Sequence, residues 1–137
     1  MKYLLDTNIC VYVMKNRIPS LTNRIFFMDP FEIAISSITV FELEYGASKS
    51  SFSEQTRRQT ARFLEPFMVI PFDKADAVMA GEIHAFLTSS GNRIGPYDTL
   101  IAAQGVARRL TVVTHNTGEF SRVPGIMLED WLETGRR

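Results

Sequence analysis

Short runs of apolar residues alternate along the chain with longer stretches of helical periodicity. Five runs are brief and rich in branched or aromatic side chains, which favours β-strands. They are Lys2–Leu5, Glu32–Ile35, Phe67–Ile70, Leu110–Val113 and Ile126–Leu128. Alternation of strand and helix is typical of a parallel sheet, and nearly continuous apolar runs are typical of strands covered on both faces. The pattern predicts an α/β fold with a mostly parallel central sheet of about five strands.

Capping residues mark where several of the predicted helices begin. Ser51 with Glu54 fits a capping box, and Asp73 can cap the helix that follows. Pro96 stands where a first helical residue is expected, in the stretch IGPYDTLIAAQGVARR. No repeat, low-complexity tract or linker divides the chain, which predicts a single domain over residues 1–137.

The charge balance, the single cysteine and the absence of long apolar segments exclude only a few classes of protein. Lys+Arg and Asp+Glu both number 15, so no overall basic field indicates nucleic acid, and any such partner needs a local basic patch. Cys10 is the only cysteine, which excludes an intramolecular disulfide, and its place in an apolar helix predicts a small core residue. No signal-peptide pattern and no window of about 18 apolar residues occur. We therefore expect a cytoplasmic protein.

Three carboxylates fall where ligands bind in open parallel sheets, beyond the carboxyl ends of the strands. Asp6 follows the first strand, and Asp98 lies in the first turn of a helix after a Gly-Pro turn. Glu42 shares a helix face with apolar residues, whereas Glu44 points about 200° away around the same helix. An inward carboxylate needs a partner, because an unpaired buried charge is very costly.

Each of these acids also has a structural explanation. Asp6 could cap the following helix, Asp98 could interact with a helix dipole, and Glu42 could pair with an arginine. Together they suggest more, because carboxylates at one place raise each other's pKa unless a cation lies among them. Mg²⁺ or Mn²⁺ prefers such oxygen ligands. We therefore expect the three acids to share a divalent ion.

Other common chemistries lack their motifs. The chain contains no GxGxxG, P-loop, HExxH or G-x-S-x-G sequence, which argues against dinucleotide or NTP binding and against zinc-protease or serine-hydrolase chemistry. His84 is expected to be a partly exposed helix residue. His115 lies nearer the acids, where a supporting or surface role is favoured over that of a metal ligand.

Four stretches together resemble the PIN-domain ribonucleases of the VapC type, the toxins of bacterial toxin–antitoxin pairs. The stretches are LLDTNICVYVMKN, ISSITVFELEYGASKS, IGPYDTLIAAQGVARRL and VVTHNTGEFSRVPGIMLEDW. The resemblance implies a three-layer α/β/α sandwich and an Mg²⁺- or Mn²⁺-dependent endoribonuclease. It places Asp6, Glu42 and Asp98 on the family's acidic, metal-binding and catalytic positions.

The resemblance leaves one acidic position of the family unfilled. The family often has a further acid after the fourth strand, where this chain has Asn116, with Thr114 before it and Glu119 slightly beyond. We expect these three residues to support the site or orient the substrate, with Glu119 acting through water. One firmly held ion is favoured over two.

The resemblance also implies three partners: an RNA substrate, for which tRNA is one candidate, a VapB-like antitoxin, and a second copy of the chain in a homodimer. Those aromatic residues that are exposed could form the antitoxin groove or the dimer face, although core packing is favoured for most of the candidates, which are Phe26, Phe27, Phe52, Phe63 and Phe67. Arginines could contact the RNA backbone or form a solvated face, and these are Arg57, Arg58, Arg62, Arg108 and Arg109.

Three alternatives remain at this stage. One is a PIN-type nuclease of RNA processing without a toxin role. Another is a receiver-like signalling domain, which also has an acidic Mg²⁺ pocket, but the chain has no Asp between Asp29 and Asp73 and no Lys after Lys74. The last is a non-catalytic binding module, which the presence of all three acids argues against.

Overall fold

Five parallel strands form the centre of the molecule, as the apolar runs predict. In the computed structural model, which describes residues 1–132, they pair in the order β3-β2-β1-β4-β5. The strands are β1 (Tyr3–Leu5), β2 (Ile33–Ser36), β3 (Met68–Ile70), β4 (Thr111–Val113) and β5 (Met127–Glu129). Each begins one residue later than expected, and all four pairings are parallel. Residues 133–137, which the single-domain prediction includes, lie outside the described residues.

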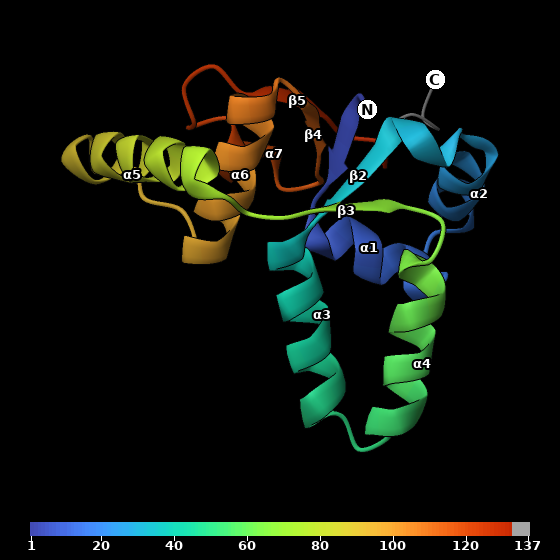
Figure 1. Cartoon of the computed structure of the whole chain (residues 1–137). Helices are drawn as coiled ribbons and strands as arrows, with labels where there is room; N and C mark the ends of the chain where they lie inside the picture. The colour runs from blue at the N-terminus through green and yellow to red at the C-terminus, as the bar shows by residue number, and fades with distance from the viewer. Residues whose placement is uncertain (133–137) are drawn as a thin grey trace.

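Helices cover both faces of the sheet, which confirms the predicted α/β/α sandwich (Figure 1). The helices are α1 (Thr7–Met14), α2 (Pro19–Phe27), α3 (Ser37–Lys49), α4 (Ser53–Leu64), α5 (Lys74–Ser89), α6 (Pro96–Arg108) and α7 (Thr117–Phe120), with a 3₁₀ turn at Pro30–Glu32. Helices α3 and α4 form a hairpin that extends below the sheet in Figure 1. None of the helices in residues 1–132 has the length and apolar character needed to cross a membrane.

The core consists of two apolar clusters, one on each face of the sheet. Successive residues of a strand point to opposite faces, so Leu4 joins the cluster beneath α5 and α6, whereas Leu5 joins the cluster beneath α1, α2 and α4. Both leucines are fully buried. Cys10 lies in the second cluster, as expected, and burial raises the pKa of its thiol well above the usual value.

The capping predictions have mixed outcomes. Asp73 forms the predicted cap and completes a reciprocal capping box with Asp76, and Pro96 is the first residue of α6. The capping box of Ser51 and Glu54 is wrong, because the N-cap of α4 is Phe52, one residue after the predicted cap. Ser50 instead accepts a hydrogen bond from the backbone N–H of Phe52.

Helix α6 lies unusually close to the sheet at Gly105. A Cβ atom there would stand 2.5 Å from Cγ2 of Val112 on β4, well inside van der Waals contact. Only glycine therefore allows this approach. Because Asp98 is on the same helix, the contact helps to set the height of that carboxylate above the strand ends.

From β1 the chain adds β2 and β3 on one side of the sheet and then β4 and β5 on the other side. The strand order therefore reverses between β1 and β4. Crevices at such a reversal are the usual ligand sites of parallel sheets. Asp6 directly follows β1 and Thr114 directly follows β4, and the backbone N–H of Asp6 donates to Val113 O at 2.9 Å. The fold thus places Asp6, the first of the predicted acids, at the crevice between β1 and β4 where ligands usually bind.

Candidate active site

Asp6 is held at the end of β1 by a hydroxyl from β4. Its side chain is only 3% exposed, and Thr114 Oγ1 donates to Asp6 Oδ2 at 2.8 Å. The backbone N–H of Asn116 donates in turn to Thr114 Oγ1 at 2.9 Å. Burial raises the pKa of Asp6, and the Thr114 hydrogen bond opposes that rise. Asp6 is at the N-cap position of α1, but its side chain makes no capping hydrogen bond.

Glu42 is anchored by two threonines rather than by the arginine considered as an alternative. Thr7 Oγ1 donates to Glu42 Oε1 at 2.6 Å, and Thr7 Oγ1 lies 2.9 Å from Thr39 Oγ1. A hydroxyl has one proton, so while Thr7 donates to the carboxylate, the hydroxyl of Thr39 must donate to Thr7. Glu44 lies elsewhere on α3 and pairs with Arg57 at 3.3 Å.

Asp98 lies in the first turn of α6 and carries a strongly shifted pKa. Partial burial, together with the negative charges of Asp6, Glu42 and Glu119, raises its pKa to about 6. The carboxylate lies beside Gly95, where a Cβ would be in ordinary van der Waals contact with it, 3.4 Å from Asp98 Oδ2. The three acids predicted from the sequence are therefore within electrostatic reach of one another.

Glu119, which follows β4 in the chain, is a fourth acid near these three. It lies in the short helix α7 and contributes to the raised pKa of Asp98. Asn116 is the N-cap residue of α7, and its side chain makes no capping hydrogen bond. The structure thus supports Glu119 as the fourth charge of the acidic cluster, which we define as Asp6, Glu42, Asp98 and Glu119.

The chemistry of the acidic cluster suits a hard divalent cation. In residues 1–132, no lysine, arginine or histidine forms a salt bridge with any of its four carboxylates. However, no group of three or more His, Cys, Asp or Glu side chains in that part of the chain is arranged so that it could hold a metal ion. An ion at this place would therefore be held by one or two carboxylates and by water, as is common for Mg²⁺. The shared three-acid ion remains a prediction.

Neither histidine belongs to the acidic cluster. His84 is exposed on α5, as expected. His115 is about half exposed, and its Nδ1 lies 3.0 Å from Asp130 Oδ2. It lines a small polar cavity with Asp6 and Asn116, so it borders the acids without pairing with them.

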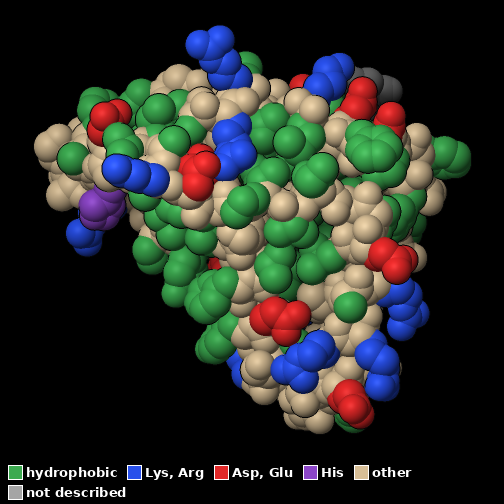
Figure 2. Space-filling model, in the orientation of Figure 1, with side chains coloured by type: hydrophobic (Ala, Val, Ile, Leu, Met, Phe, Trp, Pro, Cys, Tyr) green, Lys and Arg blue, Asp and Glu red, His purple; other side chains and the backbone are tan. Residues whose placement is uncertain are grey.

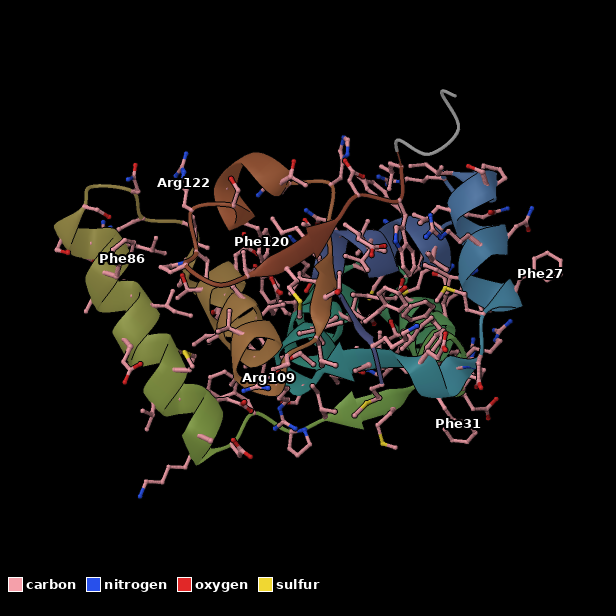
Figure 3. The ribbon with its side chains drawn as sticks, turned by 90° about the horizontal axis from the view of Figure 1, so that it is seen from above. Phe27, Phe31, Phe86, Arg109, Phe120 and Arg122 are labelled. Atoms are coloured by element: carbon pink, nitrogen blue, oxygen red, sulfur yellow. The ribbon has the colours of Figure 1, made fainter. Side chains whose placement is uncertain are left out.

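The arginines divide into surface residues and one structural residue. On α4, Arg57 pairs with Glu44, Arg58 pairs with Glu54 at 3.9 Å, and Arg62 lines a cavity. Arg109 is exposed at the end of α6 (Figure 3), so a backbone-contact role for these four stays a prediction. Arg108 instead binds Asp76 at 2.9 Å and connects α6 to α5, so its guanidinium is committed within the fold.

The candidate aromatic residues also divide by exposure. Phe26, Phe27 and Phe52 are exposed, and Figure 3 shows Phe27 pointing away from α2. Phe63 and Phe67 are buried in the core, which is the role favoured from the sequence for most of these rings. Only the three exposed rings remain candidates for the antitoxin groove or the dimer face.

Comparison with known proteins places the chain among nucleases. A family model described as PIN domain matches residues 3–126. The "tRNA(fMet)-specific endonuclease VapC" of Salmonella typhimurium is 40% identical over 131 residues, which cover 96% of this chain and 98% of the relative. "Ribonuclease VapC2" of Rickettsia felis is 40% identical over 132 residues, with 96% and 98% covered.

Solved structures agree with the sequence relatives. A DNA-bound VapBC structure from Salmonella typhimurium superposes with a TM-score of 0.91 at 40% identity, covering 96% of this chain and 98% of the other. VapBC2 from Rickettsia felis, bound to a promoter DNA fragment, gives a TM-score of 0.89 at 39% identity, covering 96% and 99%. This chain therefore belongs to the PIN-domain family and, within it, to the VapC ribonucleases.

Proposed function

We propose that the chain is a metal-dependent endoribonuclease that acts as the toxin of a toxin–antitoxin pair. The observation that carries the proposal is the acidic cluster at the sheet's reversal point, in a chain that belongs to the VapC ribonucleases. Carboxylates without cationic partners, at the usual ligand crevice, suit phosphodiester chemistry assisted by a cation.

Each acid has a proposed role in hydrolysis. Asp6 and Asp98 would hold Mg²⁺ or Mn²⁺, and Glu42 would complete the ligand set or orient and deprotonate the attacking water. When bound, the ion supplies charge neutralisation at the phosphate and lowers the pKa of water. Thr114 and Thr7 keep Asp6 and Glu42 in place by donating hydrogen bonds. Hydrolysis would leave a 5′-phosphate and a 3′-hydroxyl.

We propose tRNA as the substrate class, because the Salmonella relative is named as a tRNA(fMet)-specific endonuclease. The test incubates the purified chain with total tRNA in Mg²⁺ or Mn²⁺, with EDTA as a control, and maps the ends of the products. Cleavage at defined positions that stops with EDTA or with Asp98→Asn is expected. Undiminished cleavage by Asp98→Asn would overturn the role assigned to that residue.

We also propose a VapB-like antitoxin as partner, because the solved relatives are complexes of VapB with VapC. A cavity of about 290 Å³ between α1, α2 and α4 suits the apolar face of an antitoxin segment, and its lining includes Val13, Met14 and Phe26. An antitoxin could add a basic side chain to the acidic cluster. A homodimer and a cytoplasmic location, where tRNA is found, belong to the same proposal.

An RNA-processing nuclease without a toxin role is the alternative function. Expression with and without a neighbouring small gene distinguishes the two. A toxin arrests growth when expressed alone and is silenced by the partner, whereas a processing nuclease shows no such dependence.

A further inference from the structure

An open cleft lies directly beside the acidic cluster, between α3 and the start of α6. Its volume is about 450 Å³, and Thr7 and Glu42 belong to its wall. The rest of the wall is mainly aromatic and basic, and the residues relevant here are Phe41, Tyr45, Lys49 and Tyr97. Because Glu42 is shared with the acidic cluster, whatever fills the cleft lies next to the reacting phosphate.

Three aromatic rings of the cleft stand exposed to solvent. Phe41 is 50% exposed, Tyr45 is 59% exposed and Tyr97 is 43% exposed. The rings of Phe41 and Tyr97 meet edge to face, with centroids 5.2 Å apart and planes at 63°. Exposed rings gathered at one place usually mark a binding site, since single exposed rings are scattered over most surfaces. Figure 2 shows hydrophobic side chains gathered over α3 and the adjacent end of α6.

The positions of these rings follow from the two catalytic helices. Phe41 directly precedes Glu42 on α3, and Tyr97 directly precedes Asp98 on α6. Neighbouring residues on a helix project about 100° apart. Each helix therefore presents an acid toward the strand ends and a ring toward the cleft, and both pairs are held in fixed register.

A positive charge completes the cleft. Lys49 Nζ lies 5.0 Å from the centroid of the Tyr45 ring, a cation–π contact. No Asp or Glu in residues 1–132 forms a salt bridge with Lys49, so its ammonium group is available to an anion. Aromatic faces with a neighbouring cation are the features by which proteins bind single-stranded nucleic acid.

We propose that this cleft binds an unpaired RNA base adjacent to the bond that is cut, with the base stacked on one of the two rings of Phe41 and Tyr97, the other ring meeting it edge to face, and a flanking phosphate at Lys49. The inference rests on the proposed nuclease function and adds the way in which the substrate is selected. A base inside a helix has both faces covered by its neighbours, so the cleft favours cleavage in loops and other single-stranded regions.

The test measures RNA binding in the Asp98→Asn background, in which cleavage is removed. The ligand is a stem–loop RNA that spans the mapped cut and carries 2-aminopurine beside it. Phe41→Leu and Tyr97→Leu remove a ring but keep an apolar side chain of similar size. Each should weaken binding by about tenfold, and both should abolish the fluorescence change that stacking of 2-aminopurine produces.

Two sets of variants act as controls. Phe41→Tyr and Tyr97→Phe keep a ring and should retain binding. Phe31→Leu alters a ring that is 76% exposed, in the 3₁₀ turn before β2 and at the opposite end of that strand from the acids, and should leave binding unchanged; Figure 3 shows Phe31 at the edge of the molecule. In otherwise wild-type protein, the leucine variants should raise KM more than they lower kcat.

Specific results would overturn the inference. Unchanged affinity and KM in both leucine variants, with wild-type cleavage intact, would refute the base-binding cleft while leaving the nuclease function in place. If the leucine variants convert a dimer to a monomer and affinity for RNA is unaltered, the cleft is instead a contact between copies of the chain. Absence of cleavage by the wild-type protein would remove the proposed nuclease function itself.

Discussion

Asp98 carries the most perturbed carboxyl group of the acidic cluster, with a pKa of about 6. Its usual pKa in an unfolded chain is near 3.8. Between about pH 4 and pH 6 the folded state therefore holds a proton that the unfolded state has released. Folding stability linked to Asp98 falls as pH rises through this range, because the unfolded state binds fewer protons there.

Removal of this charge should stabilise the protein at neutral pH. In EDTA at pH 7, Asp98→Asn should raise the free energy of unfolding by about 1–2 kcal/mol, since it relieves repulsion in the cluster. The gain should shrink below pH 6 and vanish below about pH 3, because Asp98 is then protonated in both states. Urea unfolding at the two pH values measures the difference. A variant that is less stable than wild type at pH 7 would contradict the raised pKa.

Thr7 positions Glu42, although it touches no reacting atom. Thr7→Val keeps the shape of the side chain but removes the 2.6 Å hydrogen bond to Glu42. We expect RNA cleavage to fall by about 10–100-fold and Mn²⁺ affinity to fall with it, as when other residues that orient metal ligands are removed. Thr7→Ser keeps the hydroxyl and should restore both. Calorimetric titration with Mn²⁺ gives the affinity, and equal losses in the two variants would argue against a positioning role.

At the scale of elements, α5 and α6 are connected by a polar network around Asp76. This side chain is 1% exposed and accepts hydrogen bonds from Arg108 at 2.9 Å and from Gln104 at 3.1 Å. Burial alone would raise the pKa of Asp76, but these hydrogen bonds and the one from the Asp73 backbone lower it below its usual value. The network fixes the helix that carries Asp98.

Loss of the Asp76 charge should therefore be costly. Asp76→Asn should reduce the free energy of unfolding by about 2–3 kcal/mol at pH 7, because Arg108 would lose its buried partner. A lowered pKa gives stability that is present above the unfolded pKa and lost as pH falls, so the cost should shrink toward pH 3.

A surface ion pair provides the matched control for this measurement. Arg58 and Glu54 are 66% and 86% exposed on α4, and Arg58→Met should cost only about 0.3–0.5 kcal/mol. Urea unfolding of both variants measures the contrast. Equal, small costs would show that the Asp76 network contributes little to stability.

At the scale of the whole molecule, the acidic cluster and the cavity between α1, α2 and α4 are linked through α1. Asp6 immediately precedes α1, and Val13 and Met14 at the other end of this helix line the cavity. A partner in the cavity would therefore lie one helix length, about 12 Å, from the acids. That is close enough for an extended segment of the same partner to reach the cluster.

The antitoxin proposal predicts a separation of binding from catalysis. Phe26 is 54% exposed and stacks on Phe67 at 6.4 Å. Phe26→Ser should weaken antitoxin binding by tenfold or more without altering RNA cleavage by the free toxin, whereas Phe31→Ser should change neither. Titration of purified antitoxin into cleavage reactions measures both effects. Unchanged inhibition of Phe26→Ser would exclude this ring from the interface.

The sequence predicted the sheet and several helices well, because their signals are local. Short apolar runs located β1 to β5 within one residue, and Pro96 and Asp73 marked the starts of α6 and α5. The hydroxyl pair of Thr7 and Thr39 was missed, since their residues are 32 apart and no local pattern links them. Glu119 was underrated for a related reason: its nearness to Asp98 arises only when α6 and α7 meet across the strand ends.

The close approach of α6 to β4 at Gly105 makes that helix sensitive to a single methyl group. Asp98 lies seven residues away, about two turns or 10 Å along the axis. The Cβ of an alanine at position 105 would push this part of α6 away from β4 and tilt the helix. A substitution that changes no charge would therefore displace Asp98 from the other acids of the cluster. The arrangement of the acidic cluster thus depends on a residue of the core, Gly105, that carries no side chain.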